Sequence, residues 1–327
     1  MKKLIVIMIV LLTGCLSLLP AASGSLNPDW IPAHSKWVIH FDQALFSQTR
    51  LFSILDRNWR RDKDSIRSEI LDELDIDITK DLKGLTVVGF DNIDKSDKVM
   101  VVLQGSFDQS HLSKRIRNKE KDVLAKVIAG VQVLCWDGDN RLFFPEKDVM
   151  VFCESKGDIA ELVNLYQGKT KPVSTSSPLL RMLSEAPRNA FVKAAVTDIS
   201  GLTRYAPKTM VLDSASVAFF MALESRENLS MLLKLVTESD KKAQNLQQVI
   251  SGLLALVNLK MLNDDKDDEE TKFFELLNGL KVTTEGNRLI MDFNYPVDKI
   301  GQLIENMDKK KSREHDELPR DMKLEKE

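Results

Sequence analysis

Side chains that could carry out chemistry are few in this sequence and are not grouped. The histidines, which serve most often as acid–base groups and zinc ligands, are scattered along the chain: His34, His40, His111 and His315. No two of them are four residues apart, the spacing that brings two zinc ligands to one side of a helix. His40 alternates with Ile39 and Phe41, so we place it on the opposite side of a strand and interpret it as a structural histidine. The sequence predicts no metal site and no cofactor.

Motifs for nucleophilic catalysis or phosphate binding are also missing. The sequence contains no Gly-x-Ser-x-Gly elbow and no P-loop or Gly-x-Gly-x-x-Gly run, and it has only 14 glycines in 327 residues. An acidic run at 264–270 superficially resembles a calcium-binding loop. It lacks the glycine and the spaced glutamate of an EF-hand, so we interpret it as a solvated connection. No catalytic residue is predicted, and a noncatalytic protein is favoured over an enzyme.

Charged residues give little sign of a surface for polyanions. A basic cluster formed by Arg57, Arg60, Arg61 and Lys63 lies beside Trp59 and could contact an anionic lipid or polymer. Aspartates interrupt this cluster, and charge clusters at a helix end are commonly just solvated. The formal net charge is −3 and both signs are interspersed, so the chain has no basic field for nucleic acid.

Cys135 and Cys153 are the cysteines that remain once the leader is set aside. They flank a segment that we interpret as a hairpin, in which neighbouring strands lie about 5 Å apart. In an oxidising compartment such a pair can form a disulfide. Two buried thiols on apolar strands are the alternative, because neither the register nor the facing of the side chains can be read from the sequence.

The N-terminus has the layout of a secretory signal peptide, with a basic start, an apolar run at 4–12 and then small residues. Two cleavage sites are open. Cleavage before Cys15, the last residue of a lipobox-like run, would remove residues 1–14 and leave a lipid-anchored cysteine. Cleavage after the small residues Ala21-Ala22-Ser23 would remove residues 1–23, and Cys15 would then be an apolar residue of the leader. The mature chain has no apolar run long enough to span a membrane.

The two halves of the body repeat each other. Residues 130–142 (GVQVLCWDGDNRL) are matched by residues 279–289 (GLKVTTEGNRL). Each segment enters a turn rich in glycine and asparagine between apolar residues, which indicates a hairpin. Upstream, each half opens with a strand and a helix, continues with an apolar hairpin, and then has a helix, at about 108–128 and 240–262. The order in each half is strand, helix, two strands, helix, two strands, helix.

This order predicts an α+β fold made of two tandem repeats, each an antiparallel sheet covered by helices on one face and related to the split βαβ arrangement. We predict repeat 1 at 29–168, a polar linker with two prolines at 169–178, and repeat 2 at 179–308. The charged segment 309–327 is predicted to be a disordered tail, with a frayed helical extension as the alternative. The helix at 246–262 is apolar on more than one side, so we expect it to pack between the two halves, with a partner surface as the alternative.

Two short segments carry a resemblance to known proteins. Residues 31–38 (IPAHSKWV) have Pro-Ala before a hydrophobic strand, and residues 77–82 (DITKDL) have an Asp-Ile-x-x-Asp-Leu pattern. In these features and in its organisation the chain resembles a set of exported bacterial proteins with a leader and no assigned activity. The resemblance implies an exported location and this fold, and it assigns no functional residue.

We therefore expect an exported protein of the bacterial envelope, in the periplasm or tethered to a membrane by a lipid at Cys15. It would be noncatalytic, and it would either have a structural role or bind another envelope protein through its sheet surfaces or the groove between the repeats. The alternative is a hydrolase or ligand-binding protein whose site lies in that groove and is built from dispersed carboxylates. An open cleft with convergent titratable groups would favour the alternative, and a closed interface would weaken it.

Overall fold

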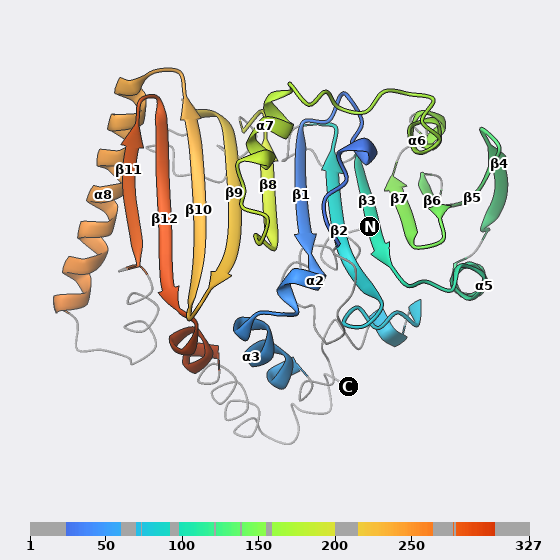
Figure 1. Ribbon diagram of the computed structural model, residues 1–327, viewed down its shortest axis with the longest axis horizontal. Coiled ribbons are helices and arrows are strands. Elements are labelled where there is room, and N and C mark those ends of the chain that lie inside the picture. Colours follow the sequence, from blue (N-terminus) through green and yellow to red (C-terminus); the bar gives the residue numbers. More distant parts are fainter. Residues whose placement is uncertain are drawn as a thin grey trace, which may run out of the picture.

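The computed structural model describes residues 24–304 except for 60–69, 73, 92–97, 121, 138, 155–158, 200–214, 264–276 and 278. Several predicted features lie outside the described residues: the leader with Cys15, Arg60, Arg61 and Lys63 of the basic cluster, the acidic run 264–270 and the tail 309–327. The described chain is built on one antiparallel sheet of 12 strands with helices packed against it (Figure 1). The predicted α+β fold is confirmed.

The strand order is the same in the two halves when it is read outward from the centre of the sheet, where β1 (Trp37–Asp42) pairs with β8 (Val192–Val196). Beyond β1 follow β2 (Leu82–Gly89), β3 (Val99–Gly105), β7 (Val149–Glu154), β6 (Asn140–Glu146), β5 (Val131–Trp136) and β4 (Leu124–Ile128). Beyond β8 follow β9 (Ala215–Ser225), β10 (Asn228–Thr237), β12 (Arg288–Pro296) and β11 (Leu280–Glu285). The series β1-β2-β3-β7-β6 therefore corresponds to β8-β9-β10-β12-β11, and β5 and β4 extend the first half.

The predicted and observed elements differ in detail. The sequence match pairs β5–β6 with β11–β12, whereas the strand order makes β6–β7 the counterpart of β11–β12. The helix predicted at 108–128 is too long, because α5 (Gln109–Lys119) ends where Glu120 becomes extended, and β4 follows it. The linker at 169–178 stays a prediction. The pairing of β1 with β8 joins the two halves in one sheet, so the halves are not separate bodies that would mark a boundary between them.

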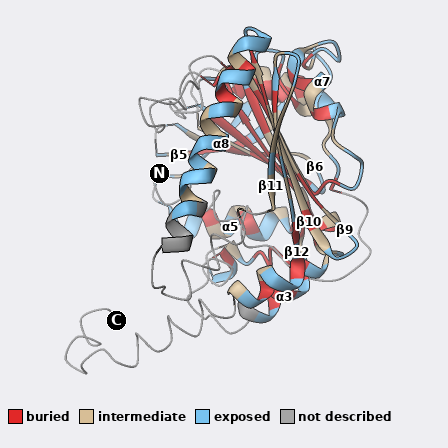
Figure 2. Cartoon of the chain, turned by 90° about the vertical axis from the view of Figure 1, so that its left-hand side faces the viewer, coloured by how far each residue is buried: buried red, intermediate tan, exposed pale blue. Residues whose placement is uncertain are grey.

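Helices cover both faces of the sheet, whereas we expected them on one. On the first face lie α2 (Gln43–Phe46), α3 (Arg50–Trp59), α5 and α8 (Asp240–Asn263), which share a large core with the strands. On the second face lie η1 (Pro28–Trp30), α6 (Ile159–Tyr166) and α7 (Pro178–Ser184), over a smaller core. Figure 2 shows α8 and α7 on opposite sides of the strands. Alternation along each strand divides the side chains between these cores: in β1, Phe41 belongs to the first and Val38 to the second.

The prediction that α8 packs between the two halves was wrong. This helix lies at the outer end of the second half, against β11, β12 and β10 (Figure 1). Ala243 and Leu246 are fully buried against the sheet, but Leu253, Leu256 and Leu259 are exposed. The wide apolar pattern of α8 therefore marks an apolar surface and not burial on two sides. None of the helices in the described ranges is long and apolar enough to cross a membrane.

The turn between β4 and β5 contains a residue type that fits its backbone poorly. Ile128 pairs with Val131, so the loop has two residues, Ala129 (φ 48°) and Gly130 (φ 85°). Positive φ at both positions is typical of a type I′ turn, which favours asparagine followed by glycine. We expect Ala129→Asn to raise the free energy of unfolding by about 0.5–1 kcal/mol, because asparagine tolerates this conformation better than alanine. Urea unfolding would measure the change. Ala129→Val should lower stability, and equal stability of the two variants would contradict the assignment.

Candidate functional site

The structure separates Cys135 from Cys153. Both residues pair with Arg141, Cys135 from one side of β6 and Cys153 from the other, so a whole strand lies between them. Two strand spacings amount to about 9–10 Å, whereas bridged cysteines have Cα atoms within about 7 Å of each other. The segment between them forms two hairpins where one was predicted, and this is why the proposed disulfide does not form here. Both residues are buried thiols that form no disulfide, the alternative that the sequence left open.

The histidines are not brought together either. His34 Nδ1 lies 3.5 Å from Glu161 Oε1, and His111 Nε2 lies 3.0 Å from Asp75 Oδ2. His40 is buried in β1, and His315 lies outside the described residues. Among the residues that the structure places, no three histidine, cysteine, aspartate or glutamate side chains are arranged to hold a metal ion.

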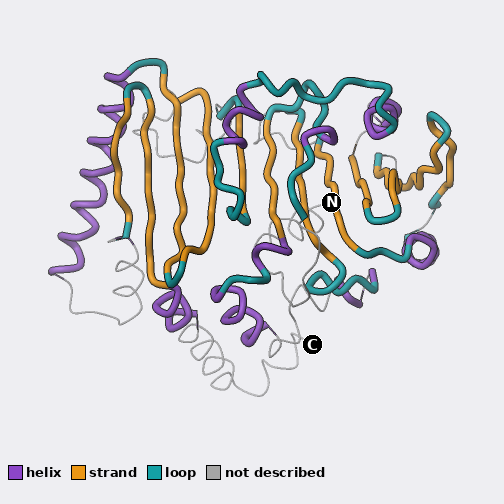
Figure 3. Tube along the Cα trace, in the orientation of Figure 1, coloured by secondary structure: helices purple, strands orange, loops and turns teal. Residues whose placement is uncertain are grey.

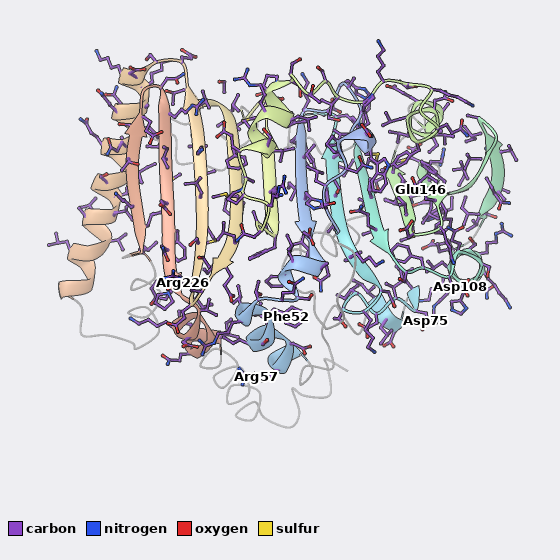
Figure 4. The ribbon with its side chains drawn as sticks, in the orientation of Figure 1. Phe52, Arg57, Asp75, Asp108, Glu146 and Arg226 are labelled. Carbon is purple, nitrogen blue, oxygen red and sulfur yellow. The ribbon has the colours of Figure 1, made fainter. Side chains whose placement is uncertain are left out.

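A small pocket beside α5 brings catalytic residue types closest to one another. Asp75, Ser106 and His111 line it together with Asp81 and Asp108, and Figure 4 labels Asp75 and Asp108 there. His111 is paired with Asp75, but no hydrogen bond joins the Ser106 hydroxyl to that imidazole within the described structure. A serine nucleophile needs a base within hydrogen-bond reach. The pocket therefore does not hold an assembled nucleophile and base.

Titratable groups converge at the junction of the two halves, where β8, β1 and β2 run side by side. Lys193, His40 and Thr86 form one row across these strands, and His40 Nδ1 lies 2.9 Å from Thr86 Oγ1. Burial, reinforced by the positive charge of Lys193, lowers the pKa of His40 to about 3. Burial also raises the pKa of Asp42 and lowers the pKa of Lys193.

This junction cluster does not form an open site. His40 is only 1% exposed, and hydrogen-bonded strands continue from one half to the other through the β1–β8 pair. A perturbed pKa points to a functional site when the group lies in a cleft, whereas this imidazole is sealed inside the sheet. The cluster is therefore enclosed in the sheet, and it does not form the open cleft that would favour a hydrolase or ligand-binding protein with a site between the repeats.

A groove on the second face of the sheet is better suited to binding. One of its walls is α7, which begins with Ser177 as N-cap and Pro178 at the first helical position, both favoured there. Three leucines of α7 are buried: Leu179, Leu180 and Leu183. A stripe with helical spacing lines the groove and consists of three residues of α7 and its C-cap residue: Pro178, Arg181, Met182 and Glu185.

The floor of this groove is the surface of three neighbouring strands. Val217 and Phe219 come from β9, Lys234 and Val236 from β10, and Arg288 from β12. In the sheet register, Val217, Val236 and Arg288 form one row across the strands, and Phe219 and Lys234 form the next. All five side chains therefore share one face. We call the site formed by the α7 stripe and these five strand residues the α7 groove.

Charges in the α7 groove are arranged around an apolar centre. Lys234 Nζ lies 5.8 Å from the centre of the Phe219 ring. It also lies 2.7 Å from Glu185 Oε2, so the one lysine and the one glutamate of the groove form an ion pair with each other. Arg181 and Arg288 are exposed, and neither guanidinium pairs with a side chain in the described part of the chain. The groove thus keeps two positive charges available for a ligand.

The size of the α7 groove limits what it can take. It encloses about 200 Å³, whereas pockets for whole small molecules usually measure about 300–1,000 Å³. This volume suits a single side chain or the end of a chain. The residues that line the groove include neither histidine nor cysteine.

The α7 groove was not predicted from the sequence. Residues 169–178 were interpreted as a linker and no helix was predicted directly after them, although Ser177-Pro178 is a recognisable helix start. The strands that form the floor were predicted. Which face of those strands stays accessible depends on the path of α7 and α8 across the sheet, and no local pattern encodes that path.

Among known proteins, the chain is similar to solved structures but matches no family model and no curated protein. Three structures of TP0453, in crystal forms I, III and IV, are similar to it with TM-scores of 0.47, 0.47 and 0.48 and sequence identities of 11%, 11% and 13%. The match covers 86% of this chain in each case, and 97%, 98% and 97% of the other. At this identity the likeness concerns the course of the backbone alone.

Proposed function

We propose that this protein is a noncatalytic, exported protein of the bacterial envelope that binds a partner protein through the α7 groove. The observation that carries the proposal is the combination, in one small groove, of an apolar floor with two exposed arginines that have no partner among the described residues. The leader pattern at residues 1–23 supports export. The mature chain would be periplasmic, or tethered to a membrane through a lipid on Cys15.

The groove favours a specific kind of contact. An apolar side chain of the partner would fill the space over Val217 and Val236, which are partly exposed, beside the ammonium group of Lys234 that lies over the buried Phe219 ring. A nearby carboxylate of the partner would then reach Arg181 or Arg288, whose guanidinium groups can form paired hydrogen bonds with it. Exposed ion pairs contribute little, but a partner that covers the groove excludes water, and hydrogen bonds to charged groups then contribute about 1.5–3 kcal/mol each.

Site-specific photo-crosslinking in envelope preparations would test the location of binding. A photoreactive amino acid in place of Met182, within the α7 groove, should give a discrete crosslinked product. The same substitution for Lys114, which is exposed on α5 in the other half, should not give that product. If no product forms at Met182, or if both positions give the same one, the α7 groove is not the binding surface.

Charge reversal would test the chemistry of binding. We expect the double variant Arg181→Glu, Arg288→Glu to bind the crosslinked partner about 100-fold more weakly, since it loses two charge-assisted contacts and gains two repulsive ones. Isothermal titration calorimetry with the purified partner would measure this loss. Arg188→Glu is the matched control, because Arg188 is exposed just beyond α7 and does not line the groove. Equal weakening by the control would show a general charge effect and contradict the proposal.

A further inference from the structure

The two edges of the 12-stranded sheet differ in what lies beside them. At one end, α8 lies along β11 (Figure 1). At the other end, β4 pairs with β5 through all five of its residues, and no strand within the described residues pairs with its other edge. Figure 3 shows β4 as the outermost strand at that end. An open edge presents unpaired N–H and C=O groups, which can hydrogen-bond to an added strand.

The side chains of β4 are unusual for a strand at an open edge. Val127 is 77% exposed and Leu124 is 57% exposed, and these are apolar residues of the kind that pack against a neighbouring strand. They lie on opposite faces, since Leu124 pairs with Cys135 and Val127 with Gln132. The two-residue turn at Ala129-Gly130 fixes β4 against β5, so the edge is already extended before anything binds.

The charge at the centre of β4 favours a different protein over a second copy of this chain as the added strand. Lys126 is exposed and is the middle residue of the strand. Antiparallel pairing of two copies centred on β4 would place Lys126 opposite the same residue of the other copy, and like charges directly opposite each other are destabilising. A lysine in an edge strand is also a common means of preventing self-association. A different protein with a carboxylate opposite Lys126 would turn this repulsion into attraction.

We infer that the open edge of β4 is a docking site for an extended segment of a partner protein, which adds to the sheet as a further strand. The segment carries an acidic residue opposite Lys126, with β-branched residues on either side that cover Leu124 and Val127. Main-chain hydrogen bonds supply affinity in this mode, and alternate side chains supply specificity. This surface is separate from the α7 groove, and the inference does not depend on the function proposed for that groove.

Two capped, fluorescent seven-residue peptides would serve as probes, with valine and threonine alternating around a central glutamate in one and a central lysine in the other. In anisotropy titrations with the full mature protein, we expect the glutamate peptide to bind about tenfold more tightly. Lys126→Glu should reverse this preference. Lys147→Glu, in the exposed turn between β6 and β7, is the matched control and should leave it unchanged.

Strand addition has a further signature that simple charge attraction lacks. Alternate amides of an added strand point toward the sheet edge, so N-methylation of one alternate set should abolish binding while N-methylation of the other set is tolerated. The Arg181→Glu, Arg288→Glu variant should bind the glutamate peptide normally. Equal effects of the two N-methylated peptides, no binding of the glutamate peptide, or dimerisation of the chain through β4 in sedimentation velocity experiments would overturn the inference.

Discussion

Acidification from pH 6.5 to about pH 3 is expected to destabilise the folded protein by as much as about 4–5 kcal/mol through His40, and His40→Gln is expected to abolish this contribution. The pKa of His40 falls from 6.5 to about 3 on folding, and each pKa unit corresponds to about 1.4 kcal/mol. Between these two pH values the unfolded chain binds a proton that the folded chain excludes. Stability is therefore present above pH 6.5 and is lost as the pH falls toward 3.

The physical cause of this sensitivity is the position of His40 at the centre of the sheet. Burial disfavours the protonated imidazole, and the charge of Lys193 across the β1–β8 pair also opposes protonation. Burial raises the pKa of Asp42, so its charged form is disfavoured in the folded state. The stability that Asp42 contributes is therefore lost as the pH rises, which is the opposite direction to His40. Comparing the natural chain with His40→Gln isolates the histidine, since Asp42 is common to both.

Urea unfolding at a series of pH values from 7 to 3 would measure the effect. The difference in unfolding free energy between the natural chain and His40→Gln should change in favour of the variant as the pH falls. His34→Gln is the control, because it also removes one histidine but leaves His40 in place, so the loss of stability assigned to His40 should persist in it. Parallel pH profiles for the natural chain and His40→Gln would show that His40 is not buried as a neutral base.

Local patterns predicted the parts of this fold that depend on local physics. The alternation in residues 37–41 placed His40 opposite Ile39 and Phe41, and the structure buries it on that second side. The helix predicted at 240–262 is α8, Asp240–Asn263. Helix and strand periodicity decide which side of an element is apolar, and this information is present within a dozen residues.

The features that were not predicted depend on contacts between distant segments. Leu124 to Ile128 form a strand because β5 is available to pair with them, although they follow directly on a helical pattern. Cys135 and Cys153 are kept apart by the insertion of β6 between them. The α7 groove exists because Arg181 is brought over strands that contain Val217 and Arg288. Pairing order and helix placement are global properties, so the sequence pattern did not predict the α7 groove or the open edge of β4.

Replacement of Gly89 by alanine is expected to destabilise the protein by about 3 kcal/mol, the upper part of the range for overpacked sites. Gly89 in β2 is the register partner of Trp37 in β1. A Cβ atom at Gly89 would lie 1.9 Å from Trp37 Cε2, so the indole would have to move. The ring has little freedom to do so, because Trp37 is buried and its Nε1 donates a hydrogen bond to the carbonyl oxygen of Asp91 at 3.1 Å.

A glycine elsewhere in the chain provides the control for this prediction. An added Cβ at Gly252 in α8 would meet no atom within 4 Å, so Gly252→Ala should stabilise the protein by about 0.5–1 kcal/mol through helix propensity. Far-ultraviolet circular dichroism during urea unfolding would report both changes. The double variant Trp37→Leu, Gly89→Ala should be less destabilised than the sum of its single changes, because the smaller side chain leaves room for the methyl group and contacting residues are coupled. Additive losses would place the cost of Gly89→Ala in the backbone of β2, and the close contact with the indole would then not be the reason for a glycine at this position.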